Sequence, residues 1–181
     1  MSSPWSPDLY IKAYRFAARA HRWQKVPGSS FPYIMHLNLV SMEIMATSAA
    51  GESFDSNLAL QCALLHDTLE DTRLRYEQIL DQFGEGVALG VRALTVDKRL
   101  PRNEQIPECL PRIRQQPREI WMVKLADRIT NLQPPPRHWS KGRIRDYHRE
   151  AGVILDALQE ASPFLAERLR LKIKDYAVHA A

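Results

Sequence analysis

Apolar residues recur at helical spacing along almost the whole of this 181-residue chain. No segment shows the sustained alternation of apolar and polar residues, bounded by hairpin turns, that a half-buried β-strand requires. The length is sufficient to bury one hydrophobic core and is that of an ordinary single domain. We therefore predict an all-α fold, a helical bundle in one compact domain that covers residues 1–181 with its core at about residues 8–178.

Capping residues, glycines and prolines predict where the helices begin and end. Ser6 followed by Pro7 is typical of an N-cap and a first helical residue. Asp55 or Ser56 is expected to cap a helix that continues unbroken through Leu69. The other expected helices, separated by loops rich in glycine and proline, cover residues 7–21, 34–49, 76–83, 86–95, 103–116, 118–132, 141–160 and 163–178.

The net charge of the chain bears on the class of partner. It is +4 at pH 7, and basic residues concentrate at residues 112–118 and 141–149. Such a balance suits a phosphorylated small molecule or a nucleic acid, and it is also what solvated basic helix faces produce. Nucleic acid is the weaker expectation, because aromatic and basic residues do not interleave on a strand platform.

The N-terminus and the cysteines bear on location. Residues 1–5 show no cationic run followed by an apolar stretch, and no window offers about 18 uninterrupted apolar residues. The two cysteines, Cys62 and Cys109, lack the Cys-x-x-Cys spacing, so neither a disulfide framework nor a thiolate zinc site is expected. We expect a cytoplasmic protein that does not enter the membrane.

The segment Leu-Leu-His-Asp-Thr-Leu-Glu-Asp-Thr at residues 64–72 carries the densest chemistry in the chain. His66 and Glu70 are four residues apart, as are Asp67 and Asp71, so in a helix each pair shares a face. The apolar residues before them predict partial burial, where unpaired carboxylates are strongly disfavoured. This crowding indicates a site for a cation.

Two further segments supply matching side chains. Asp127 lies in an amphipathic segment with Asn131 one turn further on, and His36 is expected in the first turn of its helix. Alone, each could be structural, for example a surface ion pair between Asp127 and Arg128. Together, two imidazoles and two carboxylates without a thiolate favour a divalent ion, with manganese, iron, zinc and cobalt all chemically possible. Such an ion would support the hydrolysis of a phosphate ester.

The chain resembles the HD-domain alarmone hydrolases, which are the hydrolase half of bifunctional Rel/Spo stringent-response enzymes and their small stand-alone relatives. The resemblance covers roughly residues 10–176 and rests on residues 21–24, 32–36, 64–72, 94–98 and 123–132. The forms His-Asp-x-x-Glu-Asp-Thr and Lys-Leu-Ala-Asp-Arg-x-x-Asn are much more specific than His-Asp alone. The resemblance implies an HD-domain helical bundle.

It also implies a role for each residue of the site. The ligands of one metal ion, usually Mn²⁺ in the family, would be His36, His66, Asp67 and Asp127. Glu70 and Asp71 would position and deprotonate the attacking water. Contacts to the substrate would come from Lys25, Lys98, Asn131, Arg143 and Tyr147. The last two are four residues apart, so a helix could aim both at one ligand, although they could equally belong to a solvated basic face.

The implied reaction is hydrolysis of the 3′-pyrophosphate of (p)ppGpp or a close analogue, which releases pyrophosphate and leaves GDP or GTP. No synthetase domain fits in the remainder of the chain, so hydrolysis alone is expected. The family commonly has an Arg-Lys pair where this chain has Val26 and Pro27. Because an arginine there could stack on the base, guanine preference is open and an adenine alarmone, (p)ppApp, is a real alternative. Leu37 replaces a proline that usually follows the ligand histidine, which we expect to be harmless.

Two rival functions remain. The first is another HD phosphohydrolase, acting on a deoxynucleotide, a nucleoside monophosphate or a cyclic dinucleotide. Glu70, Asp71 and the spacing from Asp127 to Asn131 argue against it. The second is a non-catalytic HD-like binding module, which would have no need of the four ligands and both acidic residues.

Overall fold

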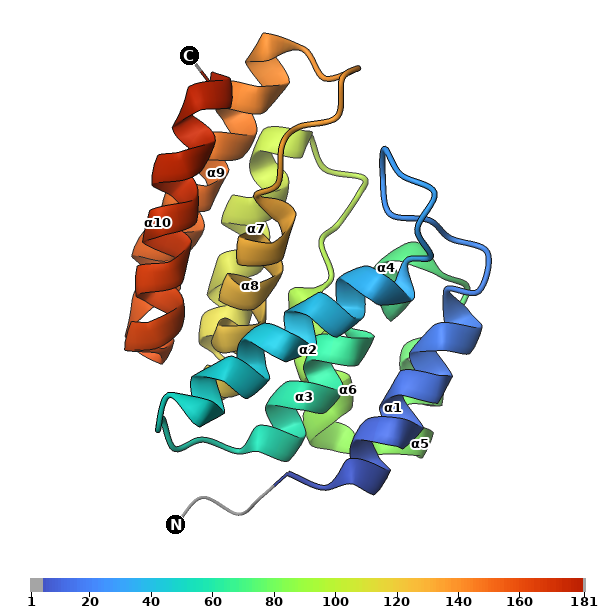
Figure 1. Cartoon of the computed structure of the whole chain (residues 1–181). Coiled ribbons are helices and arrows are strands. Elements are labelled where there is room, and N and C mark those ends of the chain that lie inside the picture. Colours follow the sequence, from blue (N-terminus) through green and yellow to red (C-terminus); the bar gives the residue numbers. More distant parts are fainter. Residues whose placement is uncertain (1–4, 181) are drawn as a thin grey trace.

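The computed structural model describes residues 5–180, and all regular elements in this range are helices (Figure 1). They are α1 (Pro7–Ala20), α2 (Ile34–Ala49), α3 (Ser56–Leu65), α4 (Thr68–Asp71), α5 (Tyr76–Phe83), α6 (Glu85–Leu94), α7 (Arg102–Arg114), α8 (Arg118–Asn131), α9 (Lys141–Leu158), the 3-10 turn η1 (Gln159–Ala161) and α10 (Pro163–Ala180). The all-α prediction is confirmed. Residues 1–4, where no leader was expected, and residue 181 lie outside the described range. Across that range, no helix is long and apolar enough to cross a bilayer.

Helices α2, α3 and α8 pack against one another and form the centre of the bundle. In Figure 1, α1 and α5 lie on one side of this centre and α7, α9 and α10 on the other, while α6 packs against α3, α5 and α7. The core between them is aliphatic, and its fully buried side chains include Leu37, Ile44, Leu64, Leu65, Ile120, Leu125 and Ile129. The same packing brings together three segments that are distant in the sequence and that each carry a motif.

The expectation of one unbroken helix through Leu69 is wrong. Helix α3 ends at Leu65, α4 begins at Thr68, and His66 and Asp67 lie between them. At Asp67 the backbone has φ −95° and ψ −1°, which is outside the main helical region. The hydroxyl of Thr68 donates to the carbonyl oxygen of Leu65 at 2.6 Å and so takes up an acceptor at the end of α3. The break turns Asp67 out of the helical array and toward α2.

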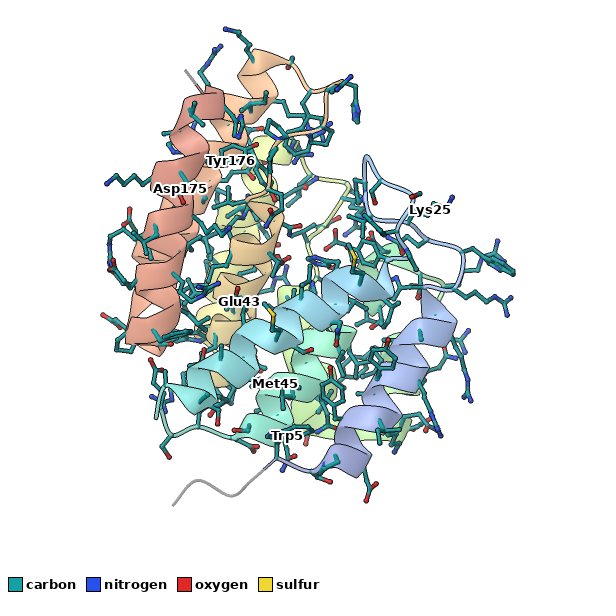
Figure 2. All side chains as sticks on the ribbon, viewed as in Figure 1. Trp5, Lys25, Glu43, Met45, Asp175 and Tyr176 are labelled. Carbon is teal, nitrogen blue, oxygen red and sulfur yellow. The ribbon has the colours of Figure 1, made fainter. Side chains whose placement is uncertain are left out.

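The C-terminal helix is joined to the centre by a partly buried ion pair. The Nε and Nη2 of Arg168 on α10 each donate to a carboxylate oxygen of Glu43 on α2, at 2.5 Å. Glu43 is only 3% exposed, and Figure 2 shows it on the side of α2 that faces the C-terminal helices. Because paired geometry of this kind is directional, it fixes how α10 lies across α2.

Gly90 permits the close approach of α6 to the central helices. A β-carbon at Gly90 would lie 2.5 Å from Cδ1 of Ile120 and 2.9 Å from Sγ of Cys62. Gly90→Ala is therefore expected to lower the free energy of unfolding by about 1–3 kcal/mol through overpacking, measured by chemical denaturation. Gly86→Ala, on the same helix, is the matched control, since its β-carbon would meet only Leu58 at 3.9 Å. Equal stability of the two variants would contradict the tight packing of α6.

Candidate active site

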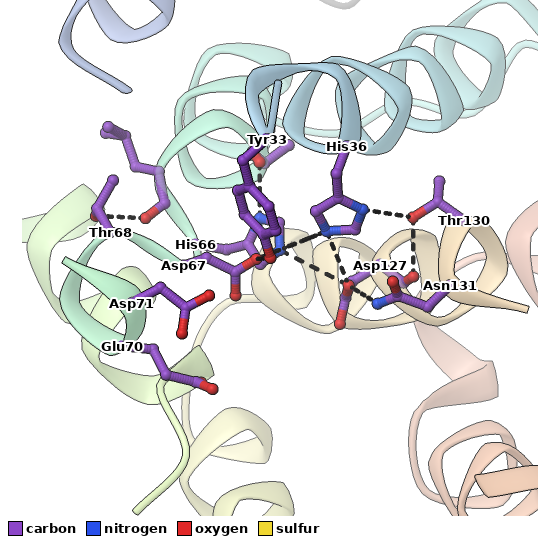
Figure 3. Close-up of polar contacts among 12 residues, drawn as sticks. Tyr33, His36, His66, Asp67, Thr68, Glu70, Asp71, Asp127, Thr130 and Asn131 are labelled. Atoms are coloured by element: carbon purple, nitrogen blue, oxygen red, sulfur yellow. Dashed lines mark hydrogen bonds and ion pairs between the residues drawn. The ribbon is translucent and has the colours of Figure 1, made fainter. Parts of the chain in front are cut away.

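The structure brings four of the predicted residues into one cluster (Figure 3). The Nε2 atoms of His36 and His66 lie 3.4 Å apart. Oδ2 of Asp67 is 2.9 Å from Nε2 of His66 and 3.6 Å from Nε2 of His36. Oδ1 of Asp127 is 3.4 Å from Nε2 of His36 and 3.7 Å from Nε2 of His66. Helix α2, the turn after α3 and helix α8 thus each contribute to one compact set of nitrogen and oxygen atoms.

The chemistry of this donor set fits a divalent cation. The Nδ1 of His66 is 2.8 Å from the carbonyl oxygen of Ala63, so it donates its proton there and leaves the Nε2 lone pair facing the cluster. The Nδ1 of His36 has a similar outer partner in the hydroxyl of Thr130 at 3.5 Å. Even without Asp127, the three residues His36, His66 and Asp67 each place one ligand atom within 4.8 Å of the others. Nitrogen and carboxylate ligands without sulfur are those of a borderline or hard divalent ion.

Neighbouring side chains orient the two aspartates. The hydroxyl of Tyr33 donates to Oδ2 of Asp67 at 2.6 Å. Burial and the Asp67 charge raise the pKa of Tyr33, so the hydroxyl keeps its proton and remains a donor. Asp127 accepts from Nδ2 of Asn131 at 2.5 Å and from Nζ of Lys124 at 3.3 Å. Burial alone would raise the pKa of Asp127, but the Lys124 charge and both imidazoles hold it well below its usual range.

The acidic pair lies beside this cluster on α4. Oε2 of Glu70 accepts from the backbone N–H of Val96 at 3.1 Å, and burial together with the Asp67 charge raises the pKa of Glu70. Oδ1 of Asp71 accepts from Nζ of Lys98 at 2.5 Å. The same lysine nitrogen is 3.5 Å from Oε1 of Glu70. The pair is thus fixed at one edge of the cluster, with one carboxyl biased toward accepting a proton.

The cluster opens into a cavity of about 430 Å³. Its wall includes the acidic pair, Asn131, Tyr147, the loop before α2 and the three prolines at residues 134–136. A β-carbon at Gly28 would lie 3.4 Å from Cβ of Pro136, so the two loops meet over the cavity. The space is that of a small-molecule site with a polar floor and a more apolar rim.

The predicted substrate contacts take different places around this cavity. Asn131 and Tyr147 line it, and Tyr147 packs at 4.2 Å against the guanidinium of Arg128. Lys25 is exposed on the loop between α1 and α2 (Figure 2). Lys98 faces the acidic pair, and the guanidinium of Arg143 lies 4.1 Å from the Trp139 ring. Contacts of these five side chains to a substrate stay a prediction.

Sequence reasoning missed three side chains that the structure places at the site. Tyr33 and Lys124 contact the two aspartates, and Gln24 donates to Asp71. All three fall inside the short stretches that carry the family resemblance, which was the available signal. The partners of Tyr33 and Gln24 are distant in the sequence, so spacing along the chain could not identify these two. Lys124 lies three residues before Asp127 on α8, and this helical spacing was a further signal for the pair.

The chain is similar to known proteins in both sequence and structure. The family model of the HD domain matches residues 13–158. Two proteins named guanosine-3′,5′-bis(diphosphate) 3′-pyrophosphohydrolase MESH1 are similar over most of both chains. The zebrafish (Danio rerio) protein is 33% identical over 171 residues, which is 91% of this chain and 92% of its own. The human (Homo sapiens) protein is 34% identical over 173 residues, which is 88% of this chain and 90% of its own.

A solved structure agrees with the sequence relatives. It is described as a metazoan orthologue of SpoT that hydrolyses ppGpp and plays a role in starvation responses. It superimposes with a TM-score of 0.82 at 26% identity and covers 96% of this chain and 98% of that one. The chain therefore belongs to the HD-domain family of the guanosine-3′,5′-bis(diphosphate) 3′-pyrophosphohydrolases.

Proposed function

We propose that this protein is a metal-dependent hydrolase that removes the 3′-pyrophosphate of an alarmone nucleotide, either (p)ppGpp or (p)ppApp, and releases pyrophosphate. The observation that carries the proposal is the meeting of two imidazoles and two aspartates beside the acidic pair of α4, at the floor of a cavity. The relatives named as 3′-pyrophosphohydrolases over about nine-tenths of the chain support the same reaction.

In this proposal the four clustered residues bind one divalent ion, with Mn²⁺ as the expected metal. His36 and His66 supply nitrogen, and Asp67 and Asp127 supply oxygen. When bound, the ion would lower the pKa of a coordinated water and offset the negative charge that develops on the phosphoryl oxygens. Lys124 adds a buried positive charge next to Asp127.

The acidic pair would prepare the attacking water. Glu70 and Asp71 lie one after the other on α4, adjacent to Asp67 in space (Figure 3). The raised pKa of Glu70 suits a group that accepts a proton near neutral pH. Water attacks the phosphorus next to the ribose 3′-oxygen, the bond between that phosphorus and oxygen breaks, and the 3′-oxygen leaves as a hydroxyl after gaining a proton. Pyrophosphate and a nucleoside 5′-diphosphate or 5′-triphosphate are the products.

The remaining predicted residues would hold the nucleotide. Asn131 would orient the substrate near the ribose or the 3′-phosphates, and its present bond to Asp127 keeps it at the edge of the cluster. Phosphate would be contacted by Lys25, Lys98, Arg143 and Tyr147. Lys98 would have to contact the phosphate while it remains next to the acidic pair.

The rim of the cavity does not determine whether the nucleobase of the substrate is guanine or adenine. Val26 and Pro27 line it where an Arg-Lys pair would offer a cationic stacking surface. Neither side chain can hydrogen-bond to a base edge, so the wall they form does not select guanine over adenine by polar contact. We therefore expect turnover of both ppGpp and ppApp.

The test is to incubate the purified protein and Mn²⁺ with ppGpp, ppApp, dGTP and a cyclic dinucleotide, and then to separate the products. We expect pyrophosphate from the first two substrates alone, and loss of the activity when the metal is removed with a chelator. The ratio of the two rates measures the base preference. Turnover of dGTP or of the cyclic dinucleotide alone would point to another HD phosphohydrolase, and no turnover of any substrate to a binding module; either result contradicts the proposal.

A further inference from the structure

A buried imidazole is connected to the acidic pair through the side chain of Gln24. The Nδ1 of His21 lies 2.6 Å from Oε1 of Gln24, and Nε2 of Gln24 donates to Oδ2 of Asp71 at 2.9 Å. His21 is only 2% exposed, although it follows directly on the end of α1. None of these three residues is a predicted metal ligand, so metal binding does not explain why they are in contact.

The two hydrogen bonds that join His21, Gln24 and Asp71 can have only one donor-to-acceptor direction. An ionised Asp71 can only accept, so Gln24 must turn its amide NH₂ toward the carboxylate and its oxygen toward His21. Nδ1 of His21 must then carry a proton. Burial is the largest influence on the pKa of His21 and lowers it, which favours the neutral ring with that one proton at Nδ1. The imidazole thereby fixes the orientation of the glutamine, and the glutamine fixes the carboxylate.

The backbone around these residues holds them in place. The N–H of Gln24 donates to the carbonyl oxygen of His21, and the carbonyl oxygen of Gln24 accepts from the N–H of Tyr33, both at 2.9 Å. The rings of His21 and Tyr33 stack with centroids 5.0 Å apart. Tyr33 donates to Asp67, so the two ends of the loop between α1 and α2, joined by this backbone hydrogen bond, contact the carboxylates of Asp71 and Asp67.

Asp71 has a second partner, but of a different kind. Lys98 binds Oδ1, and its side chain is 54% exposed. A long exposed side chain loses conformational freedom when it holds one geometry, whereas Gln24 is half-buried and its side-chain amide is also held by the buried His21. Gln24 is therefore the better-anchored contact of Asp71.

We propose that His21 and Gln24 are positioning residues that hold the Asp71 carboxylate at the angle needed to orient the attacking water for deprotonation by Glu70. The inference rests on the proposed hydrolase function and on the role of the acidic pair in it. It adds two residues that do not touch the substrate or the metal and that act through Asp71.

Gln24→Ala is expected to lower kcat for ppGpp by about 10-fold to 100-fold, because a misplaced catalytic group loses the advantage of orientation. KM and the affinity for Mn²⁺ should stay within about twofold of the parent protein, since Gln24 contacts none of the predicted metal ligands. Trp23→Ala is the matched control: it is the adjacent residue, its side chain is 85% exposed, and its variant should keep the parent kcat.

Two conservative variants give readouts that a purely structural role would not change. Gln24→Glu places a carboxylate against Asp71, which already faces Lys98, with Glu70 beside it on α4 and His21 behind Gln24. A second negative charge disfavours ionisation of Asp71, so the acidic limb of the kcat profile should move to higher pH. His21→Asn keeps an N–H donor near the position of Nδ1 and should retain more activity than His21→Ala.

The possible results distinguish the positioning role of His21 and Gln24 from the proposed hydrolase function on which it rests. If the parent protein releases pyrophosphate and Gln24→Ala does so with unchanged kcat, the positioning role is wrong while the hydrolase proposal stands. Loss of Mn²⁺ binding together with kcat, or an unmoved pH profile in Gln24→Glu, would likewise overturn it in favour of a structural role. A parent protein that releases no pyrophosphate would contradict the proposed function itself, and the positioning role with it.

Discussion

Replacing Asp67 by alanine is expected to abolish both Mn²⁺ binding and release of pyrophosphate. Oδ2 of Asp67 lies 2.9 Å from Nε2 of His66 and 3.6 Å from Nε2 of His36, so it is one of the two carboxylate oxygens that lie near both imidazoles. Its removal takes away one ligand and one of the two negative charges that attract the ion. Titration calorimetry with Mn²⁺ and a pyrophosphate assay measure the two losses separately.

Asp81→Ala is the control for this variant. Asp81 lies exposed on α5 and does not line the cavity, so its replacement removes the same chemical group without touching the cluster. The control should bind Mn²⁺ and turn over ppGpp like the parent. Normal turnover by Asp67→Ala would remove the basis for the proposed metal site.

Replacing Glu70 by alanine is expected to keep the metal and lose most of the activity. Glu70 is outside the cluster of four ligands, and its carboxylate is held by the N–H of Val96 and by Lys98 instead. Loss of a general base reduces turnover by about 10²–10⁴-fold, which is the fall in kcat that we expect at saturating Mn²⁺. Calorimetry should give a Mn²⁺ affinity close to that of the parent.

Glu77→Gln serves as the comparison for Glu70→Gln, an isosteric form of the same test. The side chain of Glu77 is 69% exposed on α5, so both its kcat and its Mn²⁺ affinity should be unchanged. If either Glu70 variant turned over normally, the assignment of the base would be wrong. A Glu70 variant that lost Mn²⁺ would instead make this residue a ligand.

Much of the fold follows from local signals. Ser6 caps α1 with Pro7 at its first position, as the sequence predicts, and Asp55, one of the two predicted candidates, caps α3 by accepting from two backbone N–H groups. The break at His66 and Asp67 does not follow, because the residues around it continue the helical spacing. It depends on a side-chain bond within the turn and on packing against α2, which a periodicity argument does not include.

Part of the site could also be predicted from the sequence. Residue chemistry grouped His36 and Asp127 with the residues after α3, but their assignment as ligands of one ion required the family resemblance, since nothing in their spacing places distant helices side by side. Local spacing did predict that Glu70 and Asp71 would neighbour the cluster. The resemblance predicts that Lys98 contacts phosphate, and this stays a prediction; that Lys98 also lies against the acidic pair could not be read from spacing along the chain.

The most direct test of the account is anomalous diffraction from crystals of the protein soaked with Mn²⁺. The proposed metal site predicts one strong peak at a bonding distance of about 2 Å from Nε2 of His36, Nε2 of His66 and a carboxylate oxygen each of Asp67 and Asp127. Manganese bound elsewhere, or a site in which Asp127 or His36 lies out of bonding range, would contradict it.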